Sequence, residues 1–272
     1  MRPESVSSAR FQNACSTTHV RTTKAMRACI KDPTPEAIHE TRIAIRKLTT
    51  AVSLMPRRFR RDDQNVKTME ALRLFYTDCA KLRDVDAMMS ALSTYVAIGD
   101  LGDVMAGLKK RRLALASRVV SSGYEELKFA LRGPANDTRG RLSKRLKKLL
   151  KERGKRAIDL YWIAARGEKK VAELHRLRKE CRHIMYLLDF ANDEAKVKSI
   201  KLDLEEAREK LGSMRDDDLL LDLLGPTKDS TPAAKVAAAV RNGRLIKYRK
   251  FFHGQTVRGK GSKLVESILS LT

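Results

Sequence analysis

Two stretches of the sequence place histidine and arginine at the same spacing. The first reads HETRIAIRK from His39 to Lys47, and the second reads HRLRKECRH from His175 to His183. On an α-helix, a histidine and the arginines three and seven positions after it fall on one narrow stripe, with a cation about every 5–6 Å. Arginine offers planar bidentate donors to phosphate oxygens, and lysine offers a point charge. The spacing therefore predicts two linear arrays of cations that suit an anion with repeated charged groups.

The side opposite each stripe is apolar, and few carboxylates interrupt the stripe itself. The apolar side carries Ile38, Thr41, Ile45, Leu48, Val52, Met55 and Phe59 in the first stretch, and Leu174, Leu177, Cys181, Ile184 and Leu188 in the second. A helix buries such a face and directs its basic stripe to solvent or into a groove. If one helix runs from Ala37 to Phe59, Arg57 continues the first stripe. A solvated surface helix is the alternative interpretation, but exposed helices usually mix both signs of charge.

The charge of the chain predicts a polyanionic partner. The 272 residues carry a formal net charge of +24 with a pI near 10.2, and 42% of them are hydrophobic, which is enough for a folded core. Such a charge attracts nucleic acid, an anionic membrane surface or a polyphosphate. Aromatic residues make up only 5% of the chain, with Trp162 the single tryptophan, and this is few for a protein that stacks nucleic-acid bases.

The cysteines and the N-terminus indicate a cytoplasmic protein. Cys15, Cys29, Cys79 and Cys181 form no CxxC pair, so buried, reduced thiols are expected rather than a zinc site. No apolar run approaches the roughly 18–20 residues of a membrane span, and the N-terminal residues lack the apolar segment of a signal peptide. We therefore expect no membrane span, no metal and no cofactor.

Helical patterns fill the chain, and no run of alternating β-branched residues predicts a strand. The expected helices are Ser5–Ile30, Ala37–Phe59, Asn65–Leu82, Asp84–Ile98, Asp103–Ser121, Glu125–Arg132, Thr138–Ala165, Leu174–Ala191, Glu194–Leu211, Leu219–Leu224, Thr231–Phe252 and Lys263–Leu271. The strongest break, at residues 133–137, lies near the middle. The sequence thus predicts an all-α protein of two halves, residues 1–133 and 134–272, each long enough for a four-helix bundle.

A second motif supports an internal repeat. The sequence RDVD at residues 83–86 follows the first stripe, and RDDD at residues 215–218 follows the second, 132 positions later. The two histidines that begin the stripes are 136 positions apart. Two aspartates on one short segment make an incomplete metal site. We therefore expect the motif aspartates to cap helices and to form buried pairs with arginine, and these aspartates are Asp84, Asp86, Asp216 and Asp218.

Together these motifs resemble the CHAD family, the conserved histidine α-helical domain. The resemblance lies in a helix reading His-x-x-Arg-x-x-x-Arg/Lys-Arg/Lys, present twice, with an Arg/Asn-Asp-x-Asp element some forty residues after each. It covers nearly the whole chain. It implies two four-helix bundles related by pseudo-twofold symmetry, with the histidine-bearing helices lining a basic central groove. It also implies that this groove binds inorganic polyphosphate, and that the protein associates with polyphosphate granules and their proteins.

The stripes and the resemblance together predict ten polyphosphate-binding residues, which are His39, Arg42, Arg46, Lys47, Arg57, His175, Arg178, Lys179, Arg182 and His183. The two leading histidines either contact phosphate in their protonated form or have a structural role. Thr49 and Met185 stand where family members usually carry a further basic residue, so a lower charge is expected at those points. The chain also lacks the ExExK strand of the CYTH triphosphatase to which family members are often fused.

Other functions have less support in the sequence. A helical RNA- or DNA-binding protein is the second choice, but it would interleave aromatic residues with the arginines, and only Tyr186 does so on either stripe. A phosphatase accessory module is a further alternative. Enzymatic activity is not expected, because the sequence contains no GxxxxGK[ST] loop, GxSxG elbow or HExxH motif.

Overall fold

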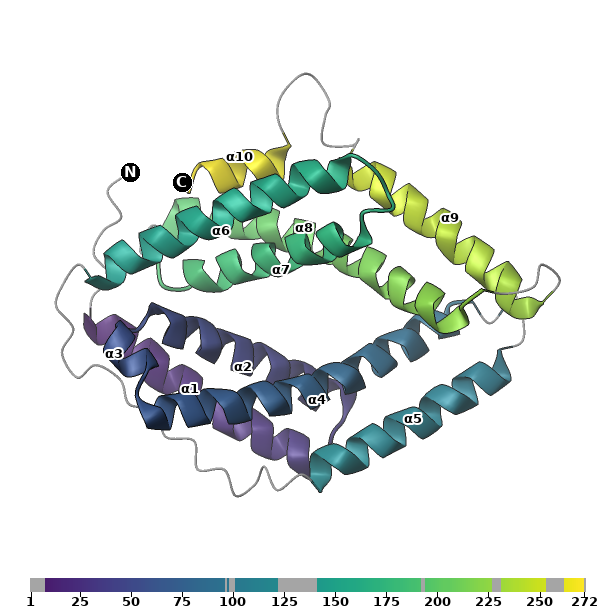
Figure 1. Cartoon of the computed structure of the whole chain (residues 1–272), viewed down its shortest axis with the longest axis horizontal. Coiled ribbons are helices and arrows are strands. Elements are labelled where there is room, and N and C mark those ends of the chain that lie inside the picture. The colour runs from purple at the N-terminus through teal and green to yellow at the C-terminus, as the bar shows by residue number, and fades with distance from the viewer. Residues whose placement is uncertain are drawn as a thin grey trace. The chain divides into compact units, whose positions relative to one another are not determined.

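The computed structural model describes residues 8–95, 97, 101–121, 141–191, 194–226, 231–252 and 262–271. All regular elements in these ranges are α-helices (Figure 1), which confirms the predicted all-α fold. They are α1 (Ser8–Lys31), α2 (Pro35–Leu54), α3 (Arg57–Arg60), α4 (Asp63–Ser93), α5 (Gly102–Val120), α6 (Arg141–Ala165), α7 (Val171–Leu188), α8 (Glu194–Leu224), α9 (Pro232–Phe252) and α10 (Lys263–Leu269). The helix predicted at residues 125–132 lies outside the described residues.

The chain divides into two compact units. We call residues 5–89 and 102–145 the N-terminal unit, which contains α1, α2, α3, α5 and most of α4. We call residues 90–101 and 146–272 the C-terminal unit, which contains α7 to α10 and most of α6. The predicted division between residues 133 and 134 falls outside the described residues and stays a prediction.

Four helices build the core of the N-terminal unit. A cluster of buried residues comes from α1, α2, α4 and α5, and it contains Met26, Cys29, Ile30, Ile38, Ile45, Leu48, Leu72, Phe75, Cys79, Leu82, Ala116 and Val119. The Oγ1 of Thr41 adds a hydrogen bond to the carbonyl oxygen of Ala25, 2.9 Å away on α1. Burying one large aliphatic side chain contributes about 1.5–3 kcal/mol. Burial of its apolar face therefore sets the rotation of α2 about its own axis, and the basic stripe lies on the opposite side of the helix.

The C-terminal unit is built around α7 and α8. Helix α8 packs along α7 and α9, and α10 also lies against α8. The apolar side of α7 is buried, with Leu174, Leu177, Cys181, Ile184, Leu187 and Leu188. An aromatic cluster joins α6 to α9 and consists of Tyr161, Tyr248, Phe251 and Phe252. The four cysteines of the chain are free thiols, and three of them are buried.

The helix that carries the first stripe is shorter than predicted. Helix α2 ends at Leu54, and Met55 adopts a ψ of 150° in front of Pro56. Proline disfavours the helical conformation in the residue before it and has no N–H group to donate. The chain then forms α3, so Arg57 lies on a separate helix of 4 residues and not on the stripe helix as predicted.

The helices that carry the Arg-Asp-x-Asp motifs are longer than predicted. Helices α4 and α8 run through these motifs without a break, where the sequence predicted junctions. In α4 the apolar face continues across the motif through Leu82, Val85 and Met88, which are all buried. The expected capping by the motif aspartates is therefore wrong, because a capping side chain needs a helix end beside it.

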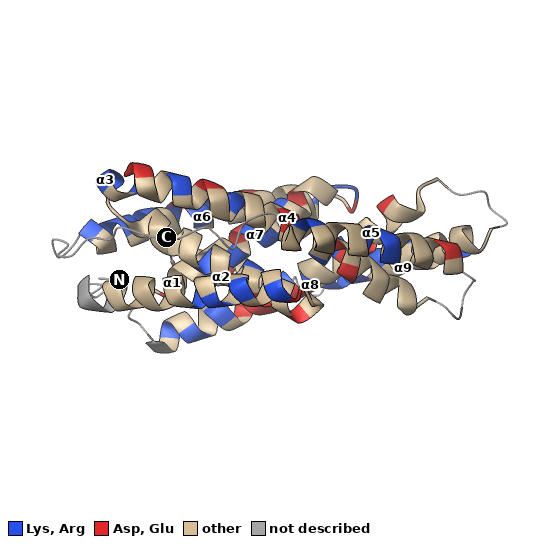
Figure 2. Cartoon of the chain, turned by 90° about the horizontal axis from the view of Figure 1, so that it is seen from below, with Lys and Arg blue, Asp and Glu red and all other residues tan. Residues whose placement is uncertain are grey.

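Charged side chains are spread over the helices of both units. Lys and Arg occur along most helices, with Asp and Glu among them (Figure 2). The excess of positive charge is thus carried by many helix surfaces as well as by the two stripes. Within the part of the chain that the structure describes, no helix combines the length and the apolar character that crossing a membrane requires.

Candidate functional site

Helix α2 presents the first stripe, which consists of His39, Arg42, Arg46 and Lys47. The helix begins at a well-formed N-terminus, because the backbone N–H of Ala37 donates to the Oγ1 of Thr34 at 3.1 Å. Pro35 occupies the first turn, where its missing N–H is harmless. His39 is exposed, whereas the other three residues of the stripe are half-buried. The stripe is thus partly enclosed by its surroundings and still open to solvent.

An aromatic ring of α4 supports both arginines of the first stripe. The guanidinium carbons of Arg42 and Arg46 lie 5.4 and 5.9 Å from the centroid of the Tyr76 ring. Cation–π contacts of this kind contribute about 0.5–1 kcal/mol at exposed sites and more where water is excluded. The Nε of Arg46 also donates to the carbonyl oxygen of Arg42 at 2.9 Å. These contacts hold both guanidinium groups in place in the absence of a ligand.

The arginine of the RDVD motif joins the first stripe. Partial burial lowers the pKa of His39, although its side chain still reaches solvent, and the positive charge of Arg83 on α4 is the next largest cause. Arg46 and Arg42 lower this pKa further, while the carboxylate of Glu40 raises it. His39 therefore lies in a cluster of three arginines that favours its neutral form.

Helix α7 presents the second stripe, which consists of His175, Arg178, Lys179, Arg182 and His183. Lys179 is exposed, and the other four residues are half-buried. Arg178 lies directly against α8 at Gly212, where a β-carbon would come within 3.2 Å of its Nε and Nη2 atoms. Glycine thus leaves room for the guanidinium group on the surface of α8, and a larger residue would displace it.

Cations also surround the leading histidine of the second stripe. Burial lowers the pKa of His175 to about 4. The positive charges of Lys179, Arg215 and Arg178 act in the same direction. Arg215 belongs to the RDDD motif on α8, at the position that matches Arg83 in the first motif. The Nδ1 of His175 is buried and has no hydrogen-bond partner among the described residues, so His175 is a neutral imidazole next to three cations at pH 7.

The last aspartate of each motif forms an ion pair with an arginine of the following helix. The Nε of Arg112 on α5 donates to Asp86 at 2.7 Å, and Arg244 on α9 pairs through its Nε with Asp218. Both carboxylates are buried, so the predicted buried pair with arginine is confirmed for Asp86 and Asp218. Asp84 is half-buried and forms no ion pair with a described residue, so the prediction is wrong for it.

Beside each stripe, the structure places residues that the sequence analysis did not assign to the site. Arg83 and Arg215 stand at matching positions of a repeated motif, so the repeat could have identified them. Tyr76 and Gly212 had no such signal, because each supports the stripe of one unit only. The position that matches Tyr76 in the repeat is Arg208. The two stripes are therefore similar in their cations and different in how those cations are held.

Comparison with known proteins decides the family. Residues 16–241 match the model of the CHAD domain. The chain belongs to the CHAD family. A solved structure with a similar fold is the crystal structure of the CHAD domain from the plant Ricinus communis, with 18% sequence identity, a TM-score of 0.59, and coverage of 96% of this chain and 90% of that chain. A search of curated proteins finds no match. The part of the chain that matches the CHAD model includes both stripes and both Arg-Asp-x-Asp motifs.

Proposed function

We propose that this CHAD domain binds inorganic polyphosphate along its two basic stripes. The observation that carries the proposal is an arrangement that recurs in both units, in which a stripe histidine and its arginines are joined by a motif arginine, Arg83 or Arg215. Cations spaced about 5–6 Å along a helix suit a linear polyanion, and guanidinium groups suit its phosphate oxygens. Membership of the CHAD family supports the same ligand. The groove that the family implies between the two halves stays a prediction.

Nucleic acid is the second candidate ligand and has less support. Proteins that bind single strands offer aromatic rings on which bases stack. The ring of Tyr76 is half-buried and already carries two arginine side chains, and Tyr186 on α7 is also half-buried. Polyphosphate has no bases and needs no such rings, so the stripes favour it over RNA or DNA.

The proposal is one of binding without hydrolysis. Asp86 and Asp218 are buried in ion pairs with arginine, so they are poorly suited to hold a catalytic metal ion. We further propose that binding brings the protein to polyphosphate granules in the cytoplasm and to the proteins of those granules.

A competition assay tests the choice of ligand. Labelled polyphosphate is bound to the purified protein at one fixed salt concentration, because the affinity of such complexes depends steeply on salt. Unlabelled polyphosphate is expected to displace it at a lower concentration of phosphate groups than RNA, DNA or ATP. Phosphate release is expected to stay at background with or without divalent metal ions. Displacement by RNA at an equal or lower concentration would favour the nucleic-acid alternative instead.

Tyr76 is expected to position the first stripe for this ligand. Replacing it with leucine removes the ring beneath Arg42 and Arg46, and we expect the Kd for polyphosphate to rise about three- to tenfold, from the loss of two cation–π contacts. Tyr76→Phe keeps the ring and is expected to bind like the wild type in the same titration. Wild-type affinity in Tyr76→Leu would show that the ring does not position the arginines.

Polyphosphate binding is expected to make His175 take up a proton. Its pKa in the free protein is about 4, so the imidazole is neutral at pH 7. A bound polyanion offsets the neighbouring cations and favours the charged imidazole, which raises the pKa. Polyphosphate affinity should therefore rise as the pH falls below 7, and His175→Gln should reduce this rise. An NMR titration of the imidazole ring measures the shift directly, and an equal midpoint with and without polyphosphate would contradict the prediction.

The same histidine is expected to lower the stability of the free protein in acid. The unfolded chain binds this proton near pH 6.5, whereas the folded protein binds it only near pH 4. The folded state therefore loses stability as the pH falls through this window, because the unfolded state takes up more protons. Urea unfolding of wild type and His175→Gln at several pH values measures this contribution, and the variant should show the weaker pH dependence.

A further inference from the structure

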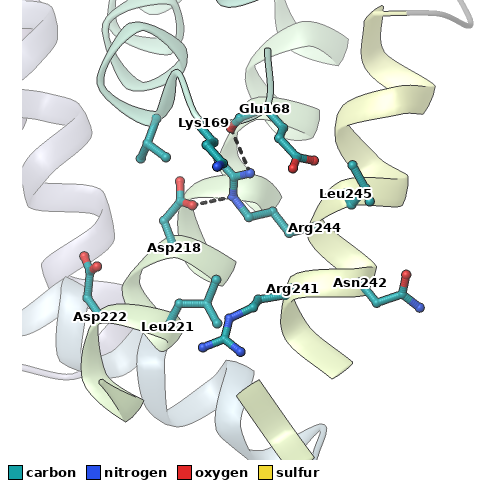
Figure 3. Close-up of a pocket in the computed structure, with 10 residues that line it drawn as sticks. Glu168, Lys169, Asp218, Leu221, Asp222, Arg241, Asn242, Arg244 and Leu245 are labelled. Carbon is teal, nitrogen blue, oxygen red and sulfur yellow. Dashed lines mark hydrogen bonds and ion pairs between the residues drawn. The ribbon is translucent and has the colours of Figure 1, made fainter. Parts of the chain in front are cut away.

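The C-terminal unit contains a cavity that no residue of the stripes lines. It has a volume of about 490 Å³ and lies between the segment before α7, the end of α8 and the middle of α9 (Figure 3). Its charged lining residues are Glu168, Lys169, Asp218, Asp222, Arg241 and Arg244. A space of this size accommodates a small molecule. We call it the Arg244 cavity.

Arg244 is the most enclosed cation of this cavity and is only 7% exposed. It lies between Asp218, which accepts from its Nε, and the carbonyl oxygen of Glu168, which accepts from its Nη1 at 3.1 Å (Figure 3). Its Nη2 is buried and has no hydrogen-bond partner among the residues that the structure describes. A buried donor without a partner costs about 1–3 kcal/mol, and more where the group is charged. This N–H group therefore favours a ligand that accepts from it.

The N-terminus of α7 supplies further donors at the same cavity. Val171, the first residue of α7, lines the cavity, and no described side chain caps this helix. The N–H groups of a first turn have no partner within the helix and carry the positive end of its dipole. Phosphate groups bind at such helix ends. The corresponding helix of the other unit, α2, is already capped by the side chain of Thr34.

The corresponding arginine of the N-terminal unit has no such open donor. The Nε of Arg112 donates to Asp86 at 2.7 Å, and its Nη2 donates to the carbonyl oxygen of Pro33 at 2.9 Å. Its side chain is 22% exposed, and none of its buried N–H groups lacks a partner in the described part of the chain. The open donor of Arg244 is therefore a property of the C-terminal unit and not of the arginine pair in general.

We propose that the Arg244 cavity binds a single phosphate group, either of orthophosphate or of a phosphomonoester. The phosphate oxygens accept from Arg244 and from the N-terminus of α7, and the exposed Lys169 adds a positive charge. The Nη2 atom is closed off from solvent, so a ligand reaches it only when a neighbouring side chain moves. The carboxylates of Asp222 and Glu168 leave the cavity near neutrality, and they suit hydroxyl groups of an ester better than a second phosphate.

Titration calorimetry with orthophosphate and with glycerol phosphate tests this proposal, at about 0.3 M salt so that diffuse surface attraction is screened. The wild type is expected to bind one equivalent. Arg244→Lys keeps a positive charge beside Asp218 but loses the Nη2 donors, and it is expected to bind at least tenfold more weakly. Tighter binding of glycerol phosphate assigns the cavity to a phosphomonoester, and equal binding assigns it to orthophosphate. Absence of saturable binding of either compound would overturn the proposal.

Two matched variants separate binding from folding. Arg112→Lys makes the same change in the ion pair of the other unit, and it is expected to bind phosphate like the wild type. Lys198→Gln removes an exposed charge of α8 that is roughly 30 Å along the helix from Asp218, and it is also expected to leave binding unchanged. Equal losses in Arg112→Lys and Arg244→Lys, or wild-type binding in Arg244→Lys, would each overturn the proposal.

This result is independent of polyphosphate binding by the stripes. The double variant Arg42→Ala with Arg178→Ala is expected to keep the calorimetric signal for glycerol phosphate, and Arg244→Lys is expected to keep polyphosphate binding. Loss of the glycerol phosphate signal in the double variant would place the phosphate on the stripes and would refute binding in the Arg244 cavity.

Discussion

Replacing Arg42 and Arg178 together by alanine is expected to weaken polyphosphate binding by roughly 100-fold or more while the helix content stays unchanged. Each guanidinium group supplies charge-assisted hydrogen bonds, which contribute about 1.5–3 kcal/mol each. Before a ligand binds, Arg42 already lies over the ring of Tyr76, and Arg178 lies against α8 at Gly212. Their removal leaves the buried apolar faces of α2 and α7 intact. Fluorescence titration with labelled polyphosphate and circular dichroism on the same samples measure both parts of this expectation.

A matched double variant controls for the loss of two positive charges. Arg111 on α5 and Arg249 on α9 are exposed arginines outside both stripes, one in each unit. Changing both to alanine lowers the net charge by the same amount as the stripe variant does. It is expected to weaken binding only about threefold or less, because exposed charges act through a screened field. If both double variants bind equally well, the charge acts diffusely and the stripe model is wrong.

The salt dependence of binding offers a second measurement. For single-stranded nucleic acid, the slope of log K against log salt is about −0.7 per neutralised phosphate. We expect similar behaviour for polyphosphate, so the stripe variant should have a shallower slope than the wild type. The control variant should keep a slope close to that of the wild type.

The stripes could be predicted from the sequence because helical periodicity is a local property. The apolar positions of both helices specify which side is buried, and the structure buries them as the pattern predicts at Ile38, Ile45, Leu48, Leu177 and Ile184. The residues on the opposite side follow from the same period. The order of the cations along α2 and α7 therefore follows from the sequence alone.

The contacts between helices could not be predicted in the same way. That Tyr76 lies beneath two arginines depends on how α4 packs against α2, and that Gly212 faces Arg178 depends on how α8 packs against α7. The sequence predicts the Arg-Asp-x-Asp motifs at helix ends, because aspartate is common in caps. The last aspartate of each motif, Asp86 or Asp218, instead lies inside a long helix and pairs with an arginine 26 positions later, Arg112 or Arg244. These ion pairs depend on how the following helix, α5 or α9, packs against the motif helix, so the sequence pattern alone does not predict them.

Replacing Asp218 by alanine is expected to cause the largest loss of stability of any single change considered, about 3–5 kcal/mol. Burial raises the pKa of the Asp218 carboxyl, and its hydrogen bond and charge interaction with Arg244 oppose that shift. Removing the carboxylate leaves the guanidinium group of Arg244 buried and uncompensated, since Arg244 is only 7% exposed. Breaking a buried ion pair in this way typically costs about 3–5 kcal/mol. Guanidinium unfolding of the purified variant measures the loss.

The corresponding change in the other unit is the control for this prediction. Asp86→Ala should cost less, about 1–3 kcal/mol, because the side chain of Arg112 is 22% exposed and water can replace part of the lost interaction. Replacing Asp218 by leucine and Arg244 by methionine together should recover most of the stability, since apolar side chains of similar volume carry no unpaired charge. If Asp218→Ala loses no more unfolding free energy than Asp86→Ala, the prediction is contradicted. Arg244 would then gain access to water in the variant, and the C-terminal unit would open more readily around this buried arginine than the structure indicates.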